Sequence, residues 1–253
     1  MRGIFSLIHT FSLMNLAVDI GNTKTKIGLF KGRKLLWNLS VPQISPRIIS
    51  GLLKNSPVES AIVSDVAAKK TKAQNAFMKI PQVIFLNNKT PLPFNNKYQT
   101  PATLGTDRLA LIAGALKYFP SKNVLVIGMG TCITYDYINS RNEYRGGSIS
   151  PGLEMRLQAL HTFTARLPQV KPKQLKVLTG HTTEESILTG VILGISHEVD
   201  GFISQYQRHY GALKVILTGG DAPLFAGRIK NSIFAVPELS LTGLNEILLH
   251  NVL

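Results

Sequence analysis

The segment from Asp19 to Lys26, DIGNTKTK, combines residue types that bind phosphate groups. A tight turn between strands exposes backbone N–H groups, and the side chains of Asn22 and Thr23 add hydrogen-bond donors. Asp19 ends a short apolar run, where its carboxylate can hold a Mg²⁺ ion, usually through water. A simple hairpin in which Asp19 caps the strand fits the same residues, so both interpretations stay open for this segment alone.

A second glycine turn, Gly128-Met129-Gly130-Thr131, also follows an apolar run. A dinucleotide-binding fold requires G-x-G-x-x-G/A before a helix, but Ile133 occupies the third glycine position and a strand is expected next. The chain also lacks the G-x-x-x-x-G-K-[ST] pattern of P-loop proteins. We expect instead that the two Gly-Thr turns face one another and hold a triphosphate from both sides.

The tetrapeptide Gly105-Thr106-Asp107-Arg108 opens a predicted helix. An acid in the first turn of a helix is favoured by the helix dipole, so Asp107 can be a capping residue. The same carboxylate can act as a general base, with Arg108 holding an anionic substrate. Only four acidic residues precede residue 119, which makes an acid inside a glycine motif notable there.

Two more glycine motifs follow predicted strands. The stretch Gly146-Gly147-Ser148-Ile149-Ser150-Pro151-Gly152 lets a ligand approach the backbone closely, or is a tight loop that ends a strand. Taken alone, the second interpretation is favoured. Gly219-Gly220-Asp221 is well placed to hold an adenosine, although it is ambiguous by itself.

Apolar periodicity predicts the strands and helices that position these turns. Predicted strands cover 16–19, 26–30, 35–39, 60–64, 83–86, 124–127, 133–138, 146–150 and 214–218, and predicted helices cover 46–53, 69–78, 106–118, 153–164, 183–210 and 241–250. Each half opens with strand, Gly-Thr turn, strand and strand. The pattern therefore predicts an α/β protein of two similar domains, 14–120 and 121–253, with the boundary near 119–123.

Composition indicates a folded chain with a basic first half. The 253 residues are 44% hydrophobic and 17% charged, with a net charge of +14. Residues 1–118 hold sixteen Lys and Arg against four Asp and Glu, and the remainder holds twelve against ten. Such charge can serve nucleic acid, a membrane surface or a phosphorylated substrate, but a solvated surface is the simpler interpretation. No apolar run predicts a membrane span, and the six histidines lack metal-binding spacing.

The amino terminus imitates a signal peptide only faintly. Its apolar stretch runs directly into the predicted strand at 16–19, and cleavage after Ala17 would remove most of that strand. We expect residues 1–13 to be a dispensable extension, with Met14 as the natural start. A cytoplasmic location is then expected, in agreement with the single cysteine.

Taken in order, these motifs resemble type III pantothenate kinase, in the actin-like ATPase superfamily of acetate and sugar kinases. The matching segments are DIGNTKTKIGLF at 19–30, YQTPATLGTDRLA at 98–110, GTCITYD at 130–136, GGSISPG at 146–152, TGHTTEESILTG at 179–190 and LTGGDA at 217–222. The resemblance implies two ribonuclease H-like domains, each a mixed sheet flanked by helices. It also implies ATP-dependent phosphorylation of the primary hydroxyl of pantothenate, the first step of coenzyme A biosynthesis.

The resemblance further implies roles for single residues. The first phosphate-binding segment corresponds to Asp19, Ile20, Gly21, Asn22, Thr23, Lys24, Thr25 and Lys26, and Thr131 is the ATP contact of the second. Asp107 corresponds to the proton acceptor. The pantothenate-binding positions are Tyr98, Gly105, Thr106, Asp107, Arg108 and Thr183. Relatives use ATP and Mg²⁺ and form homodimers with the pantothenate site near the subunit interface. We expect neither a nucleic-acid partner nor a membrane partner for this chain.

Two positions depart from the family pattern. Gly128 stands where the family's D-x-G-T usually has an Asp that binds potassium or ammonium, and glycine has no side-chain oxygen. We therefore expect activity that depends weakly on potassium, or an ion that uses other ligands. Cys132 stands where the family usually has Ala, and we interpret it as a small buried residue rather than a nucleophile.

Three other functions remain open. Some relatives of this fold are described as transcriptional accessory proteins, so a catalytically weak, ATP-binding regulator is one alternative. The G-T-D-R loop, with Tyr98 seven residues before its glycine, favours the enzyme. A kinase for another small alcohol, such as a sugar or a short acid, is the second alternative. A nucleic-acid-binding protein is supported only by the charge and ranks last.

Overall fold

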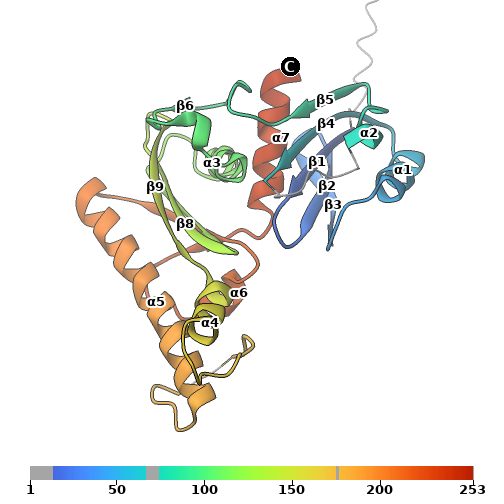
Figure 1. Ribbon diagram of the computed structural model, residues 1–253. Coiled ribbons are helices and arrows are strands. Elements are labelled where there is room, and N and C mark those ends of the chain that lie inside the picture. Colours follow the sequence, from blue (N-terminus) through green and yellow to red (C-terminus); the bar gives the residue numbers. More distant parts are fainter. Residues whose placement is uncertain (1–13, 67–73, 175–176, 253) are drawn as a thin grey trace, which may run out of the picture.

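The computed structural model describes residues 14–66, 74–174 and 177–252. Two β-sheets form separate lobes, and helices α3 (Thr106–Tyr118) and α7 (Leu239–Val252) lie between them (Figure 1). The expected extension at residues 1–13 and the first part of the expected helix at 69–78 lie outside the described residues. The rest of the chain can be compared with the sequence-based expectations element by element.

The first sheet has the strand order β3-β2-β1-β4-β5. Its strands are β1 (Met14–Ile20), β2 (Thr25–Lys31), β3 (Lys34–Val41), β4 (Val58–Asp65) and β5 (Gln82–Phe85), and its helices are α1 (Pro46–Asn55) and α2 (Gln74–Phe77). The first three strands form an antiparallel meander, and β4 and β5 run parallel to β1. β1 and β4 are buried along nearly their whole length because both faces of these central strands are covered.

The second sheet has the strand order β11-β10-β7-β8-β9-β6. Its strands are β6 (Asn95–Asn96), β7 (Val124–Met129), β8 (Cys132–Ile138), β9 (Glu143–Pro151), β10 (Lys214–Thr218) and β11 (Phe234–Ala235). Apart from β6, the order and the strand directions repeat those of the first sheet. The expected α/β fold of two mixed sheets flanked by helices is therefore confirmed, together with its internal symmetry.

The expected domain boundary near residue 120 stays a prediction. The short strand β6 comes from the first half of the chain but pairs with β9. Helix α7 comes from the second half but packs against β1, β2 and β4 of the first sheet. Each lobe thus borrows an element from the other half of the sequence.

The remaining helices are 3₁₀ helix η1 (Pro101–Thr103), α4 (Leu153–Thr162), α5 (Thr183–Tyr210) and α6 (Ala222–Phe225). The side chain of Thr182 caps α5 by accepting a hydrogen bond from the backbone N–H of Glu185, and the helix ends at Gly211, whose φ is +75°. Contrary to the expectation from sequence, α5 is long and apolar enough to span a membrane. Half of its most apolar stretch is buried inside the protein, as in a core helix.

Helices α3 and α7 touch backbone to backbone. A Cβ atom at Gly243 of α7 would overlap the carbonyl oxygen of Ala110, and one at Gly114 of α3 would lie 2.5 Å from the carbonyl oxygen of Leu239. Glycine inside a helix costs about 0.5–1 kcal/mol relative to alanine, so the close approach itself must require it. This contact joins the two lobes.

We predict that Gly243→Ala lowers the free energy of unfolding by about 1–3 kcal/mol, because the new methyl group overpacks the α3–α7 contact. The matched control is Gly201→Ala on α5, where a Cβ meets no atom within 4 Å and helix propensity should add up to about 1 kcal/mol of stability. Urea unfolding measures both variants. Equal stability changes in the two variants would contradict the account of this contact.

Candidate active site

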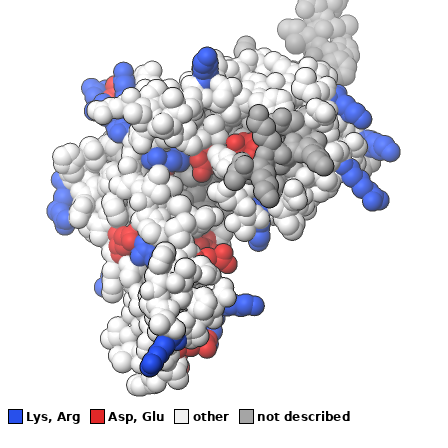
Figure 2. All heavy atoms as spheres, in the orientation of Figure 1, with Lys and Arg blue, Asp and Glu red and all other residues white. Residues whose placement is uncertain are grey.

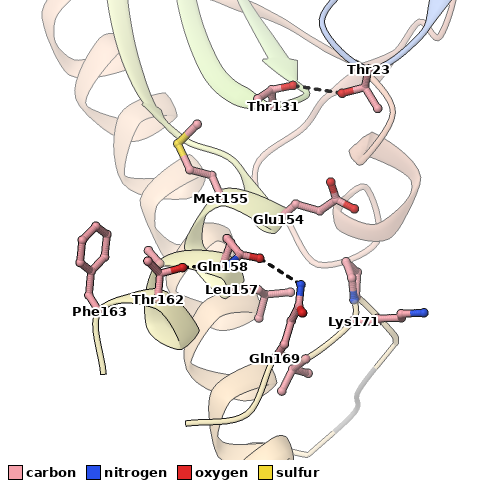
Figure 3. Close-up of a pocket in the computed structure, with 13 residues that line it drawn as sticks. Thr23, Thr131, Glu154, Met155, Leu157, Gln158, Thr162, Phe163, Gln169 and Lys171 are labelled. Atoms are coloured by element: carbon pink, nitrogen blue, oxygen red, sulfur yellow. Dashed lines mark hydrogen bonds between the residues drawn. The ribbon is translucent and has the colours of Figure 1, made fainter. Parts of the chain in front are cut away.

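The two Gly-Thr turns meet across the gap between the sheets. The first lies between β1 and β2 and is closed by a 3.1 Å hydrogen bond from the N–H of Gly21 to the carbonyl oxygen of Lys24. The second lies between β7 and β8. The hydroxyl oxygens of Thr23 and Thr131 are 3.5 Å apart, joined by a hydrogen bond (Figure 3). The structure therefore brings together the two turns that the sequence predicts as phosphate-binding segments.

Two carboxylates gather beside the first turn. Asp19 ends β1, and Asp107 lies in the first turn of α3. Burial is the main cause that raises the pKa of Asp19. The charge of Lys26 opposes this rise, and the charge of Asp107 adds a smaller rise. The hydroxyls of Ser64 at the end of β4 and Thr106 are 2.9 Å apart, which ties the start of α3 to the first sheet.

The surroundings of Asp107 explain the glycine before it. A Cβ atom at Gly105 would overlap Oδ1 of Asp107, and the same oxygen accepts a 2.9 Å hydrogen bond from the N–H of Arg108. This position suits a residue that complements the helix dipole. Capping alone does not account for a second carboxylate close by, because like charges repel and carboxylates placed together are a feature of functional sites.

The guanidinium group of Arg108 is turned away from solvent. It is 5% exposed and forms an ion pair with Asp136, which is fully buried, at 2.6 Å from Nη2 to Oδ1. Burial alone would lower the pKa of Arg108, but the hydrogen bond and charge of Asp136 raise it. The structure therefore places Arg108 on Asp136 and 5.7 Å from the ring centre of Tyr98, and its contact with substrate stays a prediction.

The glycines at 146–152 serve packing within the protein. Gly146 has a φ of +96°, and a Cβ there would lie 3.1 Å from the ring of Tyr98. A Cβ at Gly152 would overlap the carbonyl oxygens of Gly130 and Thr131 in the second turn. The segment forms the end of β9 and the start of α4, which supports the strand-end interpretation.

The turn at 219–221 packs against the second phosphate turn. Gly219 has a φ of +105°, where only glycine is unstrained, and a Cβ there would overlap the carbonyl oxygen of Met129. The N–H of Asp221 donates a 3.2 Å hydrogen bond to the same oxygen. Burial raises the pKa of Asp221, and Glu154 adds to the rise. The expected contact with adenosine stays a prediction.

A cavity of about 880 Å³ extends from the two threonines toward α4 and the segment after it. It is lined by Thr23, Thr131, Glu154, Met155, Leu157, Gln158, Ala159, Thr162, Phe163, Gln169, Val170, Lys171 and Pro172. Figure 3 shows the amide of Gln169 donating to Gln158 at the end away from the threonines, at 3.0 Å. Sequence reasoning missed this part of the site because the segment becomes a wall only by folding back on α4.

The positively charged side chains do not form a single patch on the face shown in Figure 2. On the face in Figure 2, Lys and Arg side chains are scattered, with uncharged surface between them. This distribution suits the solvated-surface interpretation of the net charge on that face.

A family model described as type III pantothenate kinase matches residues 15–205. The chain belongs to the type III pantothenate kinase family. A type III pantothenate kinase of Cytophaga hutchinsonii is 44% identical over 94% of this chain and 100% of that protein. One of Christiangramia forsetii is 44% identical over 94% of this chain and 99% of that protein.

Solved structures show the fold of this type III pantothenate kinase family member. A Campylobacter jejuni protein, proposed to be a Baf family transcriptional activator, has a TM-score of 0.58 at 21% identity and covers 93% of this chain and 98% of its own. Component A of Acidaminococcus fermentans (R)-2-hydroxyglutaryl-CoA dehydratase has a TM-score of 0.52 at 15% identity, covering 95% and 98%. A ROK hexokinase of Thermus thermophilus scores 0.50 at 12% identity, covering 95% and 100%. The fold is thus that of actin-like ATPases and ROK kinases.

Thr183, a pantothenate-binding position by the family resemblance, lies apart from the others. It is the first residue of α5, whose N-terminal end forms the lower tip of the molecule in Figure 1, far from α3. Within one chain the structure therefore brings Asp19, Thr23, Thr131 and Asp107 into one region but leaves Thr183 outside it.

The predicted magnesium position at Asp19 and the predicted monovalent-cation position at Gly128 differ in how well their residues suit an ion. Oxygen donors suit Mg²⁺, and the Asp19 carboxylate beside the first turn is such a donor. A Cβ atom added at Gly128, as a carboxylate there would require, would lie 2.9 Å from Oγ1 of Thr134 and 3.1 Å from a methyl group of Leu111. The residues present there do not fit the family's monovalent-cation site. No group of three or more His, Cys, Asp or Glu that could hold a metal occurs within the described parts of the chain; the thiol of Cys132 is partly buried.

We predict that Gly152→Ala weakens ATP binding about tenfold or more, since the methyl group must displace the backbone of the second turn and tenfold corresponds to only about 1.4 kcal/mol. The control is Gly227→Ala after α6, where a Cβ meets no atom within 4 Å. Isothermal titration calorimetry with a non-hydrolysable ATP analogue measures both. Wild-type affinity in the Gly152 variant would contradict the packing role.

Proposed function

We propose that this chain transfers the γ-phosphoryl group of ATP to the primary hydroxyl of pantothenate, forming 4'-phosphopantothenate at the first step of coenzyme A biosynthesis. Membership of the type III pantothenate kinase family over nearly the whole chain supports this activity. The structural observation that carries it is the meeting of the two predicted phosphate turns, whose Thr23 and Thr131 hydroxyls are 3.5 Å apart, beside Asp19 at the end of β1.

Phosphoryl transfer passes through a loose transition state, so positioning and charge neutralisation dominate. Thr23 and Thr131 are exposed hydroxyls on opposite turns, and in this proposal they hold phosphate oxygens from two sides. Lys24 and Lys26 add positive charge on the same hairpin. The cavity beyond the threonines has the volume of an ordinary ligand pocket and receives the rest of the nucleotide.

Asp107 accepts the proton of the pantothenate hydroxyl. The attacking oxygen of a loose transition state carries little charge early, so the base acts late in the reaction. Gly105 leaves room for the carboxylate, and the Ser64–Thr106 hydrogen bond fixes the start of the helix that carries it. These contacts hold the helix end that carries Asp107 against the first sheet.

Asp19 would hold Mg²⁺ through water, and this ion when bound supplies positive charge to the oxygens of the β- and γ-phosphates. The chain's own part is to place the carboxylate. Burial and Asp107 disfavour its charged form, while Lys26 favours it. A cation at this point would relieve the repulsion between the two carboxylates.

We also propose a homodimer in which Thr183 of a second copy completes the pantothenate site. The support is twofold. The family resemblance assigns Thr183 to this site, and α5 begins at the end of the molecule away from α3 (Figure 1). A second copy can bring that helix end to the substrate, which one chain alone does not.

Replacing Asp107 with Asn should lower kcat about 10²–10⁴-fold, the usual contribution of a general base. Binding of ATP should stay unchanged. Pantothenate-dependent ADP release with Mg-ATP measures the rate. The matched control is Glu246→Gln on α7. This change removes a carboxylate that pairs with the exposed side chain of Arg33, and it should leave the rate unaltered.

A rate loss below tenfold in the Asp107 variant would make this residue a capping or positioning group. Folded wild-type protein that binds ATP but releases no ADP with pantothenate would overturn the proposed substrate. A screen of sugars and short acids would then test the kinase alternative.

The absence of a carboxylate at position 128 predicts similar turnover in sodium and potassium chloride at equal ionic strength. N-methylglucamine chloride, whose cation is too large for such a site, is the control and should give the same rate. Strong, saturable activation by potassium would contradict this prediction and would require other ligands for the ion.

A further inference from the structure

A buried polar cluster lies behind the pantothenate-binding positions. Asp136 on β8 is fully buried and accepts three hydrogen-bond or ion-pair contacts on Oδ1: from Nε of Arg108 at 2.8 Å, from Nη2 of Arg108 at 2.6 Å and from the hydroxyl of Tyr144 at 2.7 Å. The ring of Tyr144 stacks on that of Tyr98, with centroids 6.1 Å apart. Arg108 in turn lies over the Tyr98 ring.

The cluster connects the two ends of the site. β8 begins directly after Thr131 of the second phosphate turn, and Asp136 lies farther along the same strand. Arg108 belongs to the first turn of α3, next to Asp107. Because successive residues of a strand point to opposite faces, Asp136 faces α3 while its neighbour Tyr135 faces α5. A single carboxylate thus ties the ATP-binding strand to the helix that carries the base.

Stability alone is a weak reason to keep this arrangement. Buried ion pairs are often replaceable by packed apolar residues without loss, because desolvation offsets their attraction. Burial raises the pKa of Asp136, while the hydrogen bonds of Arg108 and Tyr144 oppose that rise. What the pair does provide is a fixed direction for the Arg108 fork and for the ring of Tyr98.

We propose that Asp136 is a positioning residue for the pantothenate site, acting through Arg108 and through the stacked rings of Tyr144 and Tyr98. This inference rests on the proposed function. Asp136 does not touch the substrate. Its carboxylate holds Arg108 and Tyr98 in the orientation that receives pantothenate, and holds the first turn of α3 in place.

The opposite face of β8 offers a matched control. Tyr144 and Tyr135 are both fully buried, and each donates a 2.7 Å hydrogen bond to a carboxylate, Tyr144 to Asp136 and Tyr135 to Glu198. Glu198 lies on α5 and also pairs with Arg156, away from the predicted pantothenate positions. Tyr144 lies on β9 and Tyr135 on β8, so Tyr144→Phe and Tyr135→Phe remove the same chemical interaction from the two faces of the sheet.

The test is steady-state kinetics of Tyr144→Phe, Tyr135→Phe and Asp136→Asn, with urea unfolding of each. Loss of a hydrogen bond to a charged group should raise the KM for pantothenate about tenfold in Tyr144→Phe, and more in Asp136→Asn. The KM for ATP should stay unchanged. Tyr135→Phe should lose stability to a similar extent but keep the wild-type KM for pantothenate. A purely structural role would lower stability without this selective change in KM.

The inference is overturned if Tyr144→Phe keeps the wild-type KM for pantothenate, or if both Tyr variants raise it equally. Hydrogen exchange of residues 98–112 gives a second readout that needs no turnover and no soluble Asp136 variant. Exchange there should be faster in Tyr144→Phe than in Tyr135→Phe, and equal exchange also overturns the inference. Wild-type protein without pantothenate-dependent turnover would instead refute the proposed function, and the exchange experiment would still decide the role of the cluster.

Discussion

The backbone contact between α3 and α7 is the constraint on which the geometry of the site depends. Gly114 and Gly243 let the helices approach until neither has room for a Cβ atom. α7 packs on β1, β2 and β4, whereas α3 packs on β7 and β8 and also contacts β4. The two sheets are therefore held at one separation, and the turns that follow their first strands face each other across it.

This arrangement places two carboxylates together at the position where the anionic substrates and the metal cation are expected to bind. Asp19 and Asp107 are both partly exposed, and they lie near enough for the charge of Asp107 to raise the pKa of Asp19. Like charges placed in this way repel each other, which folding alone would not favour. A cation bound with the nucleotide would supply the compensating positive charge, because the nucleotide itself is an anion. The repulsion between the two carboxylates would thus be relieved when a cation binds with the nucleotide, as expected for a site organised for phosphoryl transfer rather than for stability.

Local sequence predicted the parts of the fold that repeat regularly. The helices at 106–118 and 183–210 and the strand at 214–218 match the structure residue for residue. The helices have apolar residues at helical spacing, the strand is a short continuous apolar run, and each has Gly or Thr at a boundary. The sequence did not predict β6, β11 and α6, because elements of two to four residues are too short to show a periodic pattern of apolar residues. The facing of the Thr23 and Thr131 turns was anticipated from symmetry. The Arg108–Asp136 pair was not, because a contact across 28 residues leaves no local signal.

The central claim is that one triphosphate lies between the two turns while the pantothenate hydroxyl meets Asp107. A crystal structure with a non-hydrolysable ATP analogue, Mg²⁺ and pantothenate measures this directly. The account predicts γ-phosphate oxygens within hydrogen-bond distance of both Thr23 and Thr131, and the primary hydroxyl within hydrogen-bond distance of the Asp107 carboxylate. A nucleotide held by one turn only, or a pantothenate hydroxyl directed away from Asp107, would contradict it.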